Sequence, residues 1–240
     1  CQLLQGCRKV TYDLHMLIFY ITVVIGILVF GAMLYSIIYH RKSLGYKPAK
    51  FHESTKVEII WTVIPFIILV GMAVPATKAL IMMEDTRDSE ITLKVTGYQW
   101  MWQYEYLEDN VSFFSKIDNE SNVARRLNSG IEVTEVDHYL RNVDNVVVLP
   151  TETKVRILLT ASDVIHAWWV PELGGKKDAI PGYINELWVD IKEPGTYRGQ
   201  CAELCGKDHG FMPIVVKAVP KNEYYKWVSI KKSNKVAKTK

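Results

Sequence analysis

Four side chains that bind soft metal ions lie close together near the carboxyl end of the sequence. They are Cys201, Cys205, His209 and Met212, in the pattern Cys-x3-Cys-x3-His-x2-Met. Thiolate and thioether sulfur, together with imidazole, select copper over hard cations. A mononuclear blue-copper site needs two histidines, one cysteine and a weak axial methionine. The additional cysteine therefore predicts a second metal ion, with both thiolates shared.

The first histidine of such a site comes from an earlier strand, and His166 in ASDVIHAWWVP is the candidate. Two other interpretations of the cluster are open at this point. Cys201 and Cys205 would form a disulfide in an oxidising compartment. Zinc would use the thiolates and the imidazole, but it has little use for Met212.

The residues around this cluster have the pattern of a β-protein. Short segments rich in Val, Ile and Thr occur at 91–97, 145–150, 154–160, 184–191 and 212–219. Pro-Gly turns separate several of them, and several short strands without helical patterns between them favour a sandwich or barrel. The polar segment 108–142 predicts a surface excursion. The Lys-rich segment 221–240 predicts a terminal helix or a frayed tail.

The first third of the chain predicts two membrane-spanning helices. Residues 14–39 contain no Asp, Glu, Lys or Arg, and residues 57–80 carry charges only at their ends, at Glu58 and Lys78. About 20 mostly apolar residues suffice to cross the hydrocarbon layer. The connector 40–56 has five Lys or Arg against one Glu. Such loops stay on the cytoplasmic side, which would place both the N-terminus and the body outside. The alternative is a pair of helices buried in a large soluble core.

Charge is segregated along the 240 residues. Residues 1–83 carry a net charge of +5, residues 84–219 carry −8, and residues 220–240 carry +6. This distribution excludes a nucleic-acid module with one basic face, and the apolar content excludes a disordered chain. We expect a membrane hairpin over 1–83, a globular domain over 84–220 and a basic tail over 221–240.

The N-terminus carries a cysteine. Because the sequence begins with Cys1, we expect a processed start. Attachment of a lipid to Cys1 and a disulfide between Cys1 and Cys7 are both open.

Taken together, the motifs resemble subunit II of the haem-copper cytochrome c oxidases over nearly the whole chain. The segments that carry the resemblance are KVEIIWTVIP, GYQWMWQYEY, DVIHAWWVP, KKDAIPG and QCAELCGKDHGFMPI. The resemblance implies a two-helix transmembrane hairpin followed by an all-β, cupredoxin-like Greek-key barrel. It also implies a dinuclear copper centre called CuA in the barrel.

The resemblance further implies a role for each residue of the centre. Cys201 and Cys205 would bridge the two copper ions. His209 and the backbone carbonyl of Glu203 would complete one copper, and His166 and Met212 the other. A shell around the centre would exclude water and tune its potential, and it includes the side chains of Phe211, Trp168 and Trp169.

Three roles outside the copper ligands follow from the same resemblance. Trp100 would be the aromatic residue through which electrons enter, although alternation along a half-buried strand also explains its position. The side chain of Glu203 would bind a non-redox Mg²⁺ shared with subunit I, in a polar junction that Asp178 assists. Glu58 would lie at the mouth of a proton pathway, or it would only reach the headgroups.

The implied function is electron transfer within a larger enzyme. The subunit would accept electrons from cytochrome c and pass them to the haem and copper centres of subunit I, where O₂ becomes water and protons are pumped. Subunit I, subunit III, cytochrome c and membrane lipid are the expected partners, without nucleic acid. The excess of acidic residues in the body would attract a basic cytochrome. The expected location is the bacterial cytoplasmic membrane with a periplasmic domain, or the mitochondrial inner membrane in a eukaryote.

Four other functions compete with this one. Subunit II of a quinol oxidase shares the hairpin and barrel but has lost the copper ligands, which this sequence keeps. A membrane-tethered copper carrier, or the CuA subunit of a reductase for nitrogen oxides, would use the same module. A structural or assembly protein would have a disulfide between Cys201 and Cys205.

Overall fold

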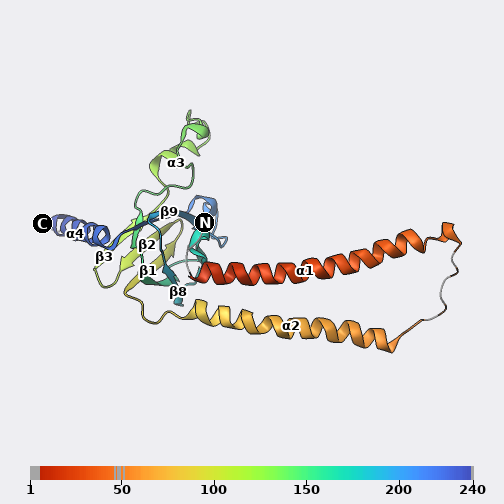
Figure 1. The fold of residues 1–240 in the computed structure, drawn as a ribbon. Helices are drawn as coiled ribbons and strands as arrows, with labels where there is room; N and C mark the ends of the chain where they lie inside the picture. The colour runs from red at the N-terminus through yellow and green to blue at the C-terminus, as the bar shows by residue number, and fades with distance from the viewer. Residues whose placement is uncertain (1–5, 46, 48–49, 51, 239–240) are drawn as a thin grey trace. The chain divides into compact units, whose positions relative to one another are not determined.

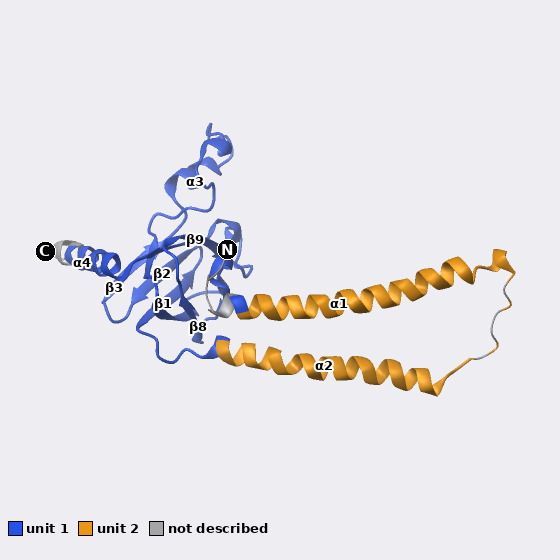
Figure 2. Ribbon diagram, viewed as in Figure 1, with its two compact units in different colours: residues 1–9, 83–240 blue, residues 10–82 orange. Residues whose placement is uncertain are grey.

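The computed structural model describes the backbone of residues 6–238 except 46, 48–49 and 51, and side chains between residues 9 and 233 (Figure 1). Cys1 and the side chain of Cys7 lie outside the described residues, so lipid attachment or pairing there stays a prediction. The chain divides into two compact units, residues 10–82 and residues 1–9 with 83–240 (Figure 2).

The first unit consists of two long apolar helices. Helix α1 runs over Gly6–Tyr39 and α2 over Thr55–Glu84, with the short 3-10 helix η1 (Lys42–Leu44) in the connector. At about 1.5 Å per residue they are about 51 and 45 Å long, more than the hydrocarbon layer of about 30 Å requires. Both are long and apolar enough to span a membrane. Pro65 and Pro75 lie inside α2.

The second unit is built on two five-stranded sheets. The first has the order β3 (Val111–Ser115), β2 (Met101–Tyr106), β1 (Ile91–Tyr98), β5 (Lys154–Ala161), β8 (Asn185–Asp190). The second has the order β4 (Val147–Pro150), β10 (Pro213–Val219), β9 (Gly195–Cys201), β6 (His166–Val170), β7 (Gly175–Ala179). Among the described pairings, β1 with β5 and β4 with β10 are parallel, and the others are antiparallel.

Alternation of side chains along the strands builds the core of this unit. In β5, Val155, Ile157 and Leu159 are buried while the residues between them are partly exposed. Because successive side chains of a strand point to opposite faces, one face of the strand is apolar. Strand β10 is buried at nearly every position, as expected for a strand covered on both faces. The large rings of Trp102 and Trp168 are fully buried in the same core.

Four short helices and one longer C-terminal helix complete the described part of the second unit. They are α3 (Asn119–Ala124), the 3-10 helices η2 (Val133–Glu135), η3 (Pro171–Leu173) and η4 (His209–Phe211), and the C-terminal α4 (Lys221–Lys238). The segment 108–142 is not wholly a surface excursion, because its first part forms the edge strand β3, where Val111 is buried. Of the two interpretations of the C-terminal segment, the helix is the one observed, and Tyr224 and Val228 of α4 are buried.

Candidate metal centre

Two strands and one loop bring the predicted ligands together. His166 is the first residue of β6 and Cys201 the last of β9, and these strands pair antiparallel with Trp168 opposite Cys201. The loop after β9 folds back, because the N–H of Cys201 donates to the carbonyl of Met212 at 3.0 Å. Gly206 has a φ of +118°, a backbone conformation that other residues rarely adopt. This turn brings Cys205 and the helix η4 back toward Cys201.

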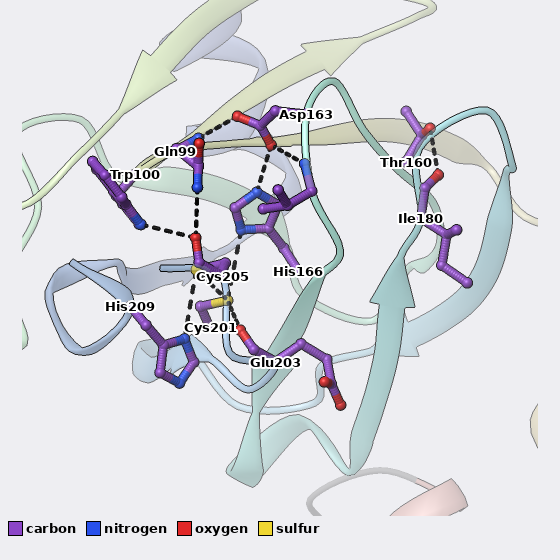
Figure 3. Close-up of polar contacts among 11 residues, drawn as sticks. Gln99, Trp100, Thr160, Asp163, His166, Ile180, Cys201, Glu203, Cys205 and His209 are labelled. Carbon is purple, nitrogen blue, oxygen red and sulfur yellow. Dashed lines mark hydrogen bonds and ion pairs between the residues drawn. The ribbon is translucent and has the colours of Figure 1, made fainter. Parts of the chain in front are cut away.

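Sulfur and nitrogen atoms converge at short distances in this loop (Figure 3). The Sγ atoms of Cys201 and Cys205 are 3.8 Å apart. The Nδ1 of His166 lies 3.8 Å from Sγ of Cys201, and the Nδ1 of His209 lies 3.5 Å from Sγ of Cys205. The backbone carbonyl of Glu203 accepts from the Cys201 thiol at 3.3 Å. A disulfide needs about 2.05 Å between sulfur atoms, so both thiols are free in this arrangement.

A carboxylate that the sequence interpretation missed holds the ring of His166. Oδ1 of Asp163 lies 2.9 Å from Nε2 of His166. The carboxylate itself accepts from the backbone N–H groups of Gln99 at 2.7 Å and Val164 at 2.6 Å. With Nε2 held in this way, Nδ1 is left facing Cys201, and such a carboxylate orients many metal-binding histidines. The sequence signal that could have indicated this contact is an Asp three residues before the candidate histidine.

Burial and neighbouring groups set the protonation of the two thiols in opposite directions. Burial is the largest influence on Cys201 and opposes its ionisation, but hydrogen bonds with His166, His209 and the backbone of Ala167 and Glu203 together lower the pKa of this thiol below its ordinary value. Burial and the adjacent Cys201 raise the pKa of Cys205. One thiolate therefore forms readily and the second does not. Cysteine binds metal ions as the thiolate, so metal binding at this pair would release protons.

Trp100 connects the molecular surface with a ligand residue. Its Nε1 donates to the backbone carbonyl of Cys205 at 3.2 Å, and Nε2 of Gln99 donates to the same oxygen at 2.8 Å (Figure 3). The ring is partly exposed, and Nζ of Lys207 lies 5.6 Å from its centroid. Trp100 therefore lies beside the metal loop and does not merely alternate along a strand; it falls between β1 and β2.

Four of the candidate ligand side chains are buried, and the fifth, His209, is half-buried. His166 is fully buried, and Cys201, Cys205 and Met212 are each at most 2% exposed. Trp102 packs edge-on against the His166 ring with centroids 5.8 Å apart. Trp168 is fully buried, whereas Trp169 and Phe211 are half-buried. Trp102 thus contacts a candidate ligand although the expected shell did not include it, and the shell of Phe211, Trp168 and Trp169 stays a prediction.

Other predicted residues lie apart from the sulfur atoms. The Glu203 carboxylate is exposed and points away from the cluster, although its carbonyl faces Cys201 (Figure 3). Asp178 lies in β7, where its backbone carbonyl accepts from Nδ2 of Asn185. Glu58 belongs to α2, in the helical unit.

The donor set fits copper. Two thiols and two imidazole nitrogens face one another, a backbone carbonyl lies beside them, and a buried methionine ends the loop. Soft sulfur and imidazole are the ligands copper prefers, and the combination lacks the several oxygen atoms that hard cations need.

Comparison with known proteins identifies the family. Residues 91–219 match the family model of the periplasmic domain of cytochrome c oxidase subunit II, and residues 7–79 match the model of its transmembrane domain. The chain belongs to the cytochrome c oxidase subunit II family. It is similar to the probable cytochrome c oxidase subunit 2 of Rickettsia prowazekii, with 43% identity over 94% of this chain and 69% of the relative.

Solved structures of subunit II domains match the β-unit. The periplasmic domain of subunit II of cytochrome oxidase from Bradyrhizobium japonicum is 37% identical, with a TM-score of 0.54 over 62% of this chain and 98% of that one. A subunit II domain in a mixed disulfide with a thioredoxin-like protein is also 37% identical, with a TM-score of 0.50 over 62% and 96%. These matches confirm the predicted fold class, two apolar helices followed by a cupredoxin-like β-domain.

Family membership establishes the general role of the chain. It is a subunit of a haem-copper oxidase, an oxidoreductase complex, and its family carries a copper centre of the CuA type. The His166, Cys201 and Cys205 cluster is the corresponding site here. The two apolar helices and the transmembrane match indicate a two-pass inner-membrane protein.

Proposed function

We propose that this subunit accepts electrons from cytochrome c at a dinuclear copper centre and passes them toward the haem of subunit I. One observation carries the proposal. The thiols of Cys201 and Cys205 each have a histidine Nδ1 within 3.8 Å, and Trp100 donates a hydrogen bond to the carbonyl of Cys205. A partly exposed ring is thus joined directly to a ligand residue.

Each candidate ligand would have its own role in binding the metal. Cys201 and Cys205 would be shared by two copper ions, and the remaining ligands would be His166, His209, Met212 and the backbone carbonyl of Glu203. When bound, the copper pair would supply a one-electron carrier between cytochrome c and subunit I. Protein groups would supply all of these ligands, and the site would lack the open position that a catalytic metal site keeps for substrate.

The surroundings would keep this set in place during electron transfer. Asp163 holds His166, and Gln99 and Trp100 hold the carbonyl of Cys205. Ligands fixed in this way do not need to rearrange when charge changes. The buried rings of Trp102 and Trp168 exclude water on the protein side.

Two further roles are proposed for exposed carboxylates. The Glu203 side chain points away from the thiols and is free to bind Mg²⁺ with oxygen ligands from subunit I (Figure 3). Glu58, in the first turns of α2, would serve the entrance of a proton pathway.

Subunit I, subunit III and cytochrome c are the proposed partners. The β-domain is proposed to be periplasmic, or to face the corresponding side of the mitochondrial inner membrane.

The proposal is tested on the purified oxidase containing this chain. We expect two copper ions per subunit II and an electron paramagnetic resonance spectrum in which one electron is shared by two copper nuclei. Trp100→Ala should retain this spectrum while electron uptake from reduced cytochrome c slows severalfold in stopped-flow measurements. Trp100→Phe, which keeps a ring but loses the N–H donor, separates the ring from the hydrogen bond. Absence of copper would count against the proposed copper centre. An unchanged uptake rate in Trp100→Ala would count against electron entry through Trp100.

A further inference from the structure

A charged side chain from outside the metal loop contacts the residue before η4 and the last residue of η4. Arg125 follows α3, in the segment between β3 and β4. Its Nη1 donates to Oδ1 of Asp208 at 3.2 Å, and its guanidinium carbon lies 4.3 Å from the centroid of the Phe211 ring. Asp208 immediately precedes His209, and Phe211 immediately precedes Met212. Arg125 thus contacts the neighbours of two candidate ligands at once.

The position of Arg125 is itself fixed by its surroundings. Its Nε donates to Oδ1 of Asn122 at 2.9 Å, and its backbone N–H donates to the carbonyl of Ser121. The N-terminus of α3 is capped by Asp118, which accepts from the N–H of Ser121 at 2.9 Å. Oγ of Ser121 accepts in turn from the N–H of Leu140 at 3.1 Å. The planar guanidinium has its donors committed in different directions, which leaves it little rotational freedom.

The turn that Arg125 contacts has weak support of its own. Helix η4 is three residues long, and Asp208 at its N-cap makes no side-chain hydrogen bond to its backbone. Such short 3-10 turns have poor hydrogen-bond geometry and need outside contacts to persist. Arg125 and Asp208 have side chains only 24% exposed, so their ion pair is less screened than a fully exposed one. The cation above the Phe211 ring adds a second attachment.

We propose that Arg125 is a positioning residue of the metal centre. By holding Asp208 and Phe211, it fixes the 208–211 turn and so keeps His209 and Met212 in place before metal binds. The inference rests on the proposed copper site and extends it to a residue about 80 positions away from the ligands in sequence. The segment that carries Arg125 therefore serves the metal centre and is more than a surface excursion.

The test compares Arg125→Gln with a matched control, Arg126→Gln, in the full chain purified in detergent. Both variants lose one positive charge from the same segment, but Arg126 is exposed. Copper affinity is measured by competition with a chelator, and the copper spectrum by electron paramagnetic resonance. We expect Arg125→Gln to bind copper about 10- to 100-fold more weakly, the usual effect of removing a group that supports a ligand. Its hyperfine pattern should change, whereas Arg126→Gln should match the wild type.

Two further variants test separately the planar guanidinium of Arg125 and its contact with the Phe211 ring. Arg125→Lys keeps the charge but lacks the planar fork, so it should restore only part of the affinity. Phe211→Leu removes the ring face alone, and its effect should be non-additive with Arg125→Gln because both act on one turn. If Arg125→Gln fails to fold, the copper affinities of Arg125→Lys and of Phe211→Leu alone are the test, and wild-type affinity in both would overturn the role of Arg125.

The outcomes separate the two levels of the proposal. A wild-type chain that binds no copper contradicts the proposed function. A wild-type chain that binds copper, with Arg125→Gln equal to it in affinity and spectrum, overturns only the role of Arg125. A lower melting temperature of the copper-free Arg125→Gln chain with unchanged copper affinity also overturns it, because the contact would then be merely structural.

Discussion

Gly97 is the residue whose lack of a side chain matters most to the metal centre. A Cβ at this position would lie 2.7 Å from Cδ2 and 2.9 Å from Cγ of His166. Asp163 binds Nε2 of the same ring and Trp102 packs against it, so the His166 ring has little room to yield. We expect Gly97→Ala to reduce the copper content of the purified chain at least about 10-fold, by displacing a ligand and its supporting contact.

A matched control is available in another strand. At Gly175 an added Cβ would meet only Leu187, at 3.8 Å, which is ordinary contact. Gly175→Ala should therefore keep the copper content and spectrum of the wild type. Elemental analysis of both variants is the measurement, and a fully loaded Gly97→Ala chain would contradict the assigned contact.

Replacing Cys205 and replacing Met212 should have different effects on the copper centre. A hydroxyl cannot substitute for a shared thiolate, so Cys205→Ser should abolish the dinuclear signal. A thioether is a weak ligand, so Met212→Leu should retain copper but shift its reduction potential. Met212 is 1% exposed, and leucine has a similar volume, so the variant should fold. The reduction potential of Met212→Leu is measured by redox titration, followed by the visible spectrum. A potential equal to that of the wild type would remove Met212 from the ligand set.

The sequence was informative about ligands and uninformative about the groups that orient them. Cys201, Cys205 and His209 lie within nine residues, and sulfur with imidazole has few uses other than soft metals. Asp163 and Arg125 are ordinary charged residues whose roles depend on what the fold brings beside them. Only the pairing of β6 with β9 and the return of the segment after β3 determine those neighbours.

Among the secondary-structure elements, α4 shows how a basic helix can be part of a folded core. Tyr224 is fully buried, and its hydroxyl donates to Oδ2 of Asp109 at 2.9 Å. We expect Tyr224→Ala to destabilise the docking of α4 by about 3 kcal/mol, the lower end for loss of a buried aromatic ring. Tyr225, next to it, is 56% exposed. Tyr225→Ala should change stability by no more than about 0.5 kcal/mol.

Limited trypsin digestion followed by mass spectrometry measures this difference. Cleavage after Lys226 should be much faster in Tyr224→Ala than in the wild type, because trypsin cleaves unfolded backbone and the undocked helix would unfold more readily. Equal cleavage in the Tyr224 and Tyr225 variants would mean that α4 is not held by its buried face.

Strand and helix predictions succeeded where hydrophobic patterns are long or alternate cleanly. The apolar runs at 14–39 and 57–80 lie within α1 and α2, and the Val-rich segments coincide with β1, β4, β5, β8 and β10. Strands β3, β7 and β9 were not predicted, because VSFFS, GKKDA and GTYRGQC lack a sustained alternation of apolar residues. The burial of α4 was missed because lysines outnumber the three residues, Tyr224, Trp227 and Val228, that pack on the core.

On the scale of the whole molecule, the segregation of charge matches the division into units. The connector between α1 and α2 is basic, whereas residues 84–219 carry a net charge of −8. An acidic domain attracts a basic electron donor over distances of about a Debye length and does so less as salt increases. The same asymmetry argues for orientation, since Lys and Arg in short loops remain on the cytoplasmic side.

This orientation gives a prediction about the accessibility of two exposed positions. Ser43 lies in η1 within the basic connector, and Leu127, 93% exposed, lies in the segment after α3. In a chain with Cys1 and Cys7 replaced by serine, the remaining cysteines Cys201 and Cys205 are 2% exposed and should react slowly. A membrane-impermeant maleimide added to spheroplasts of a bacterial host should then label Leu127→Cys but not Ser43→Cys. Inverted membrane vesicles should give the opposite result, because the connector then faces the reagent. Labelling of Ser43→Cys in spheroplasts would reverse the assigned topology and place the metal centre on the cytoplasmic side, away from a periplasmic cytochrome.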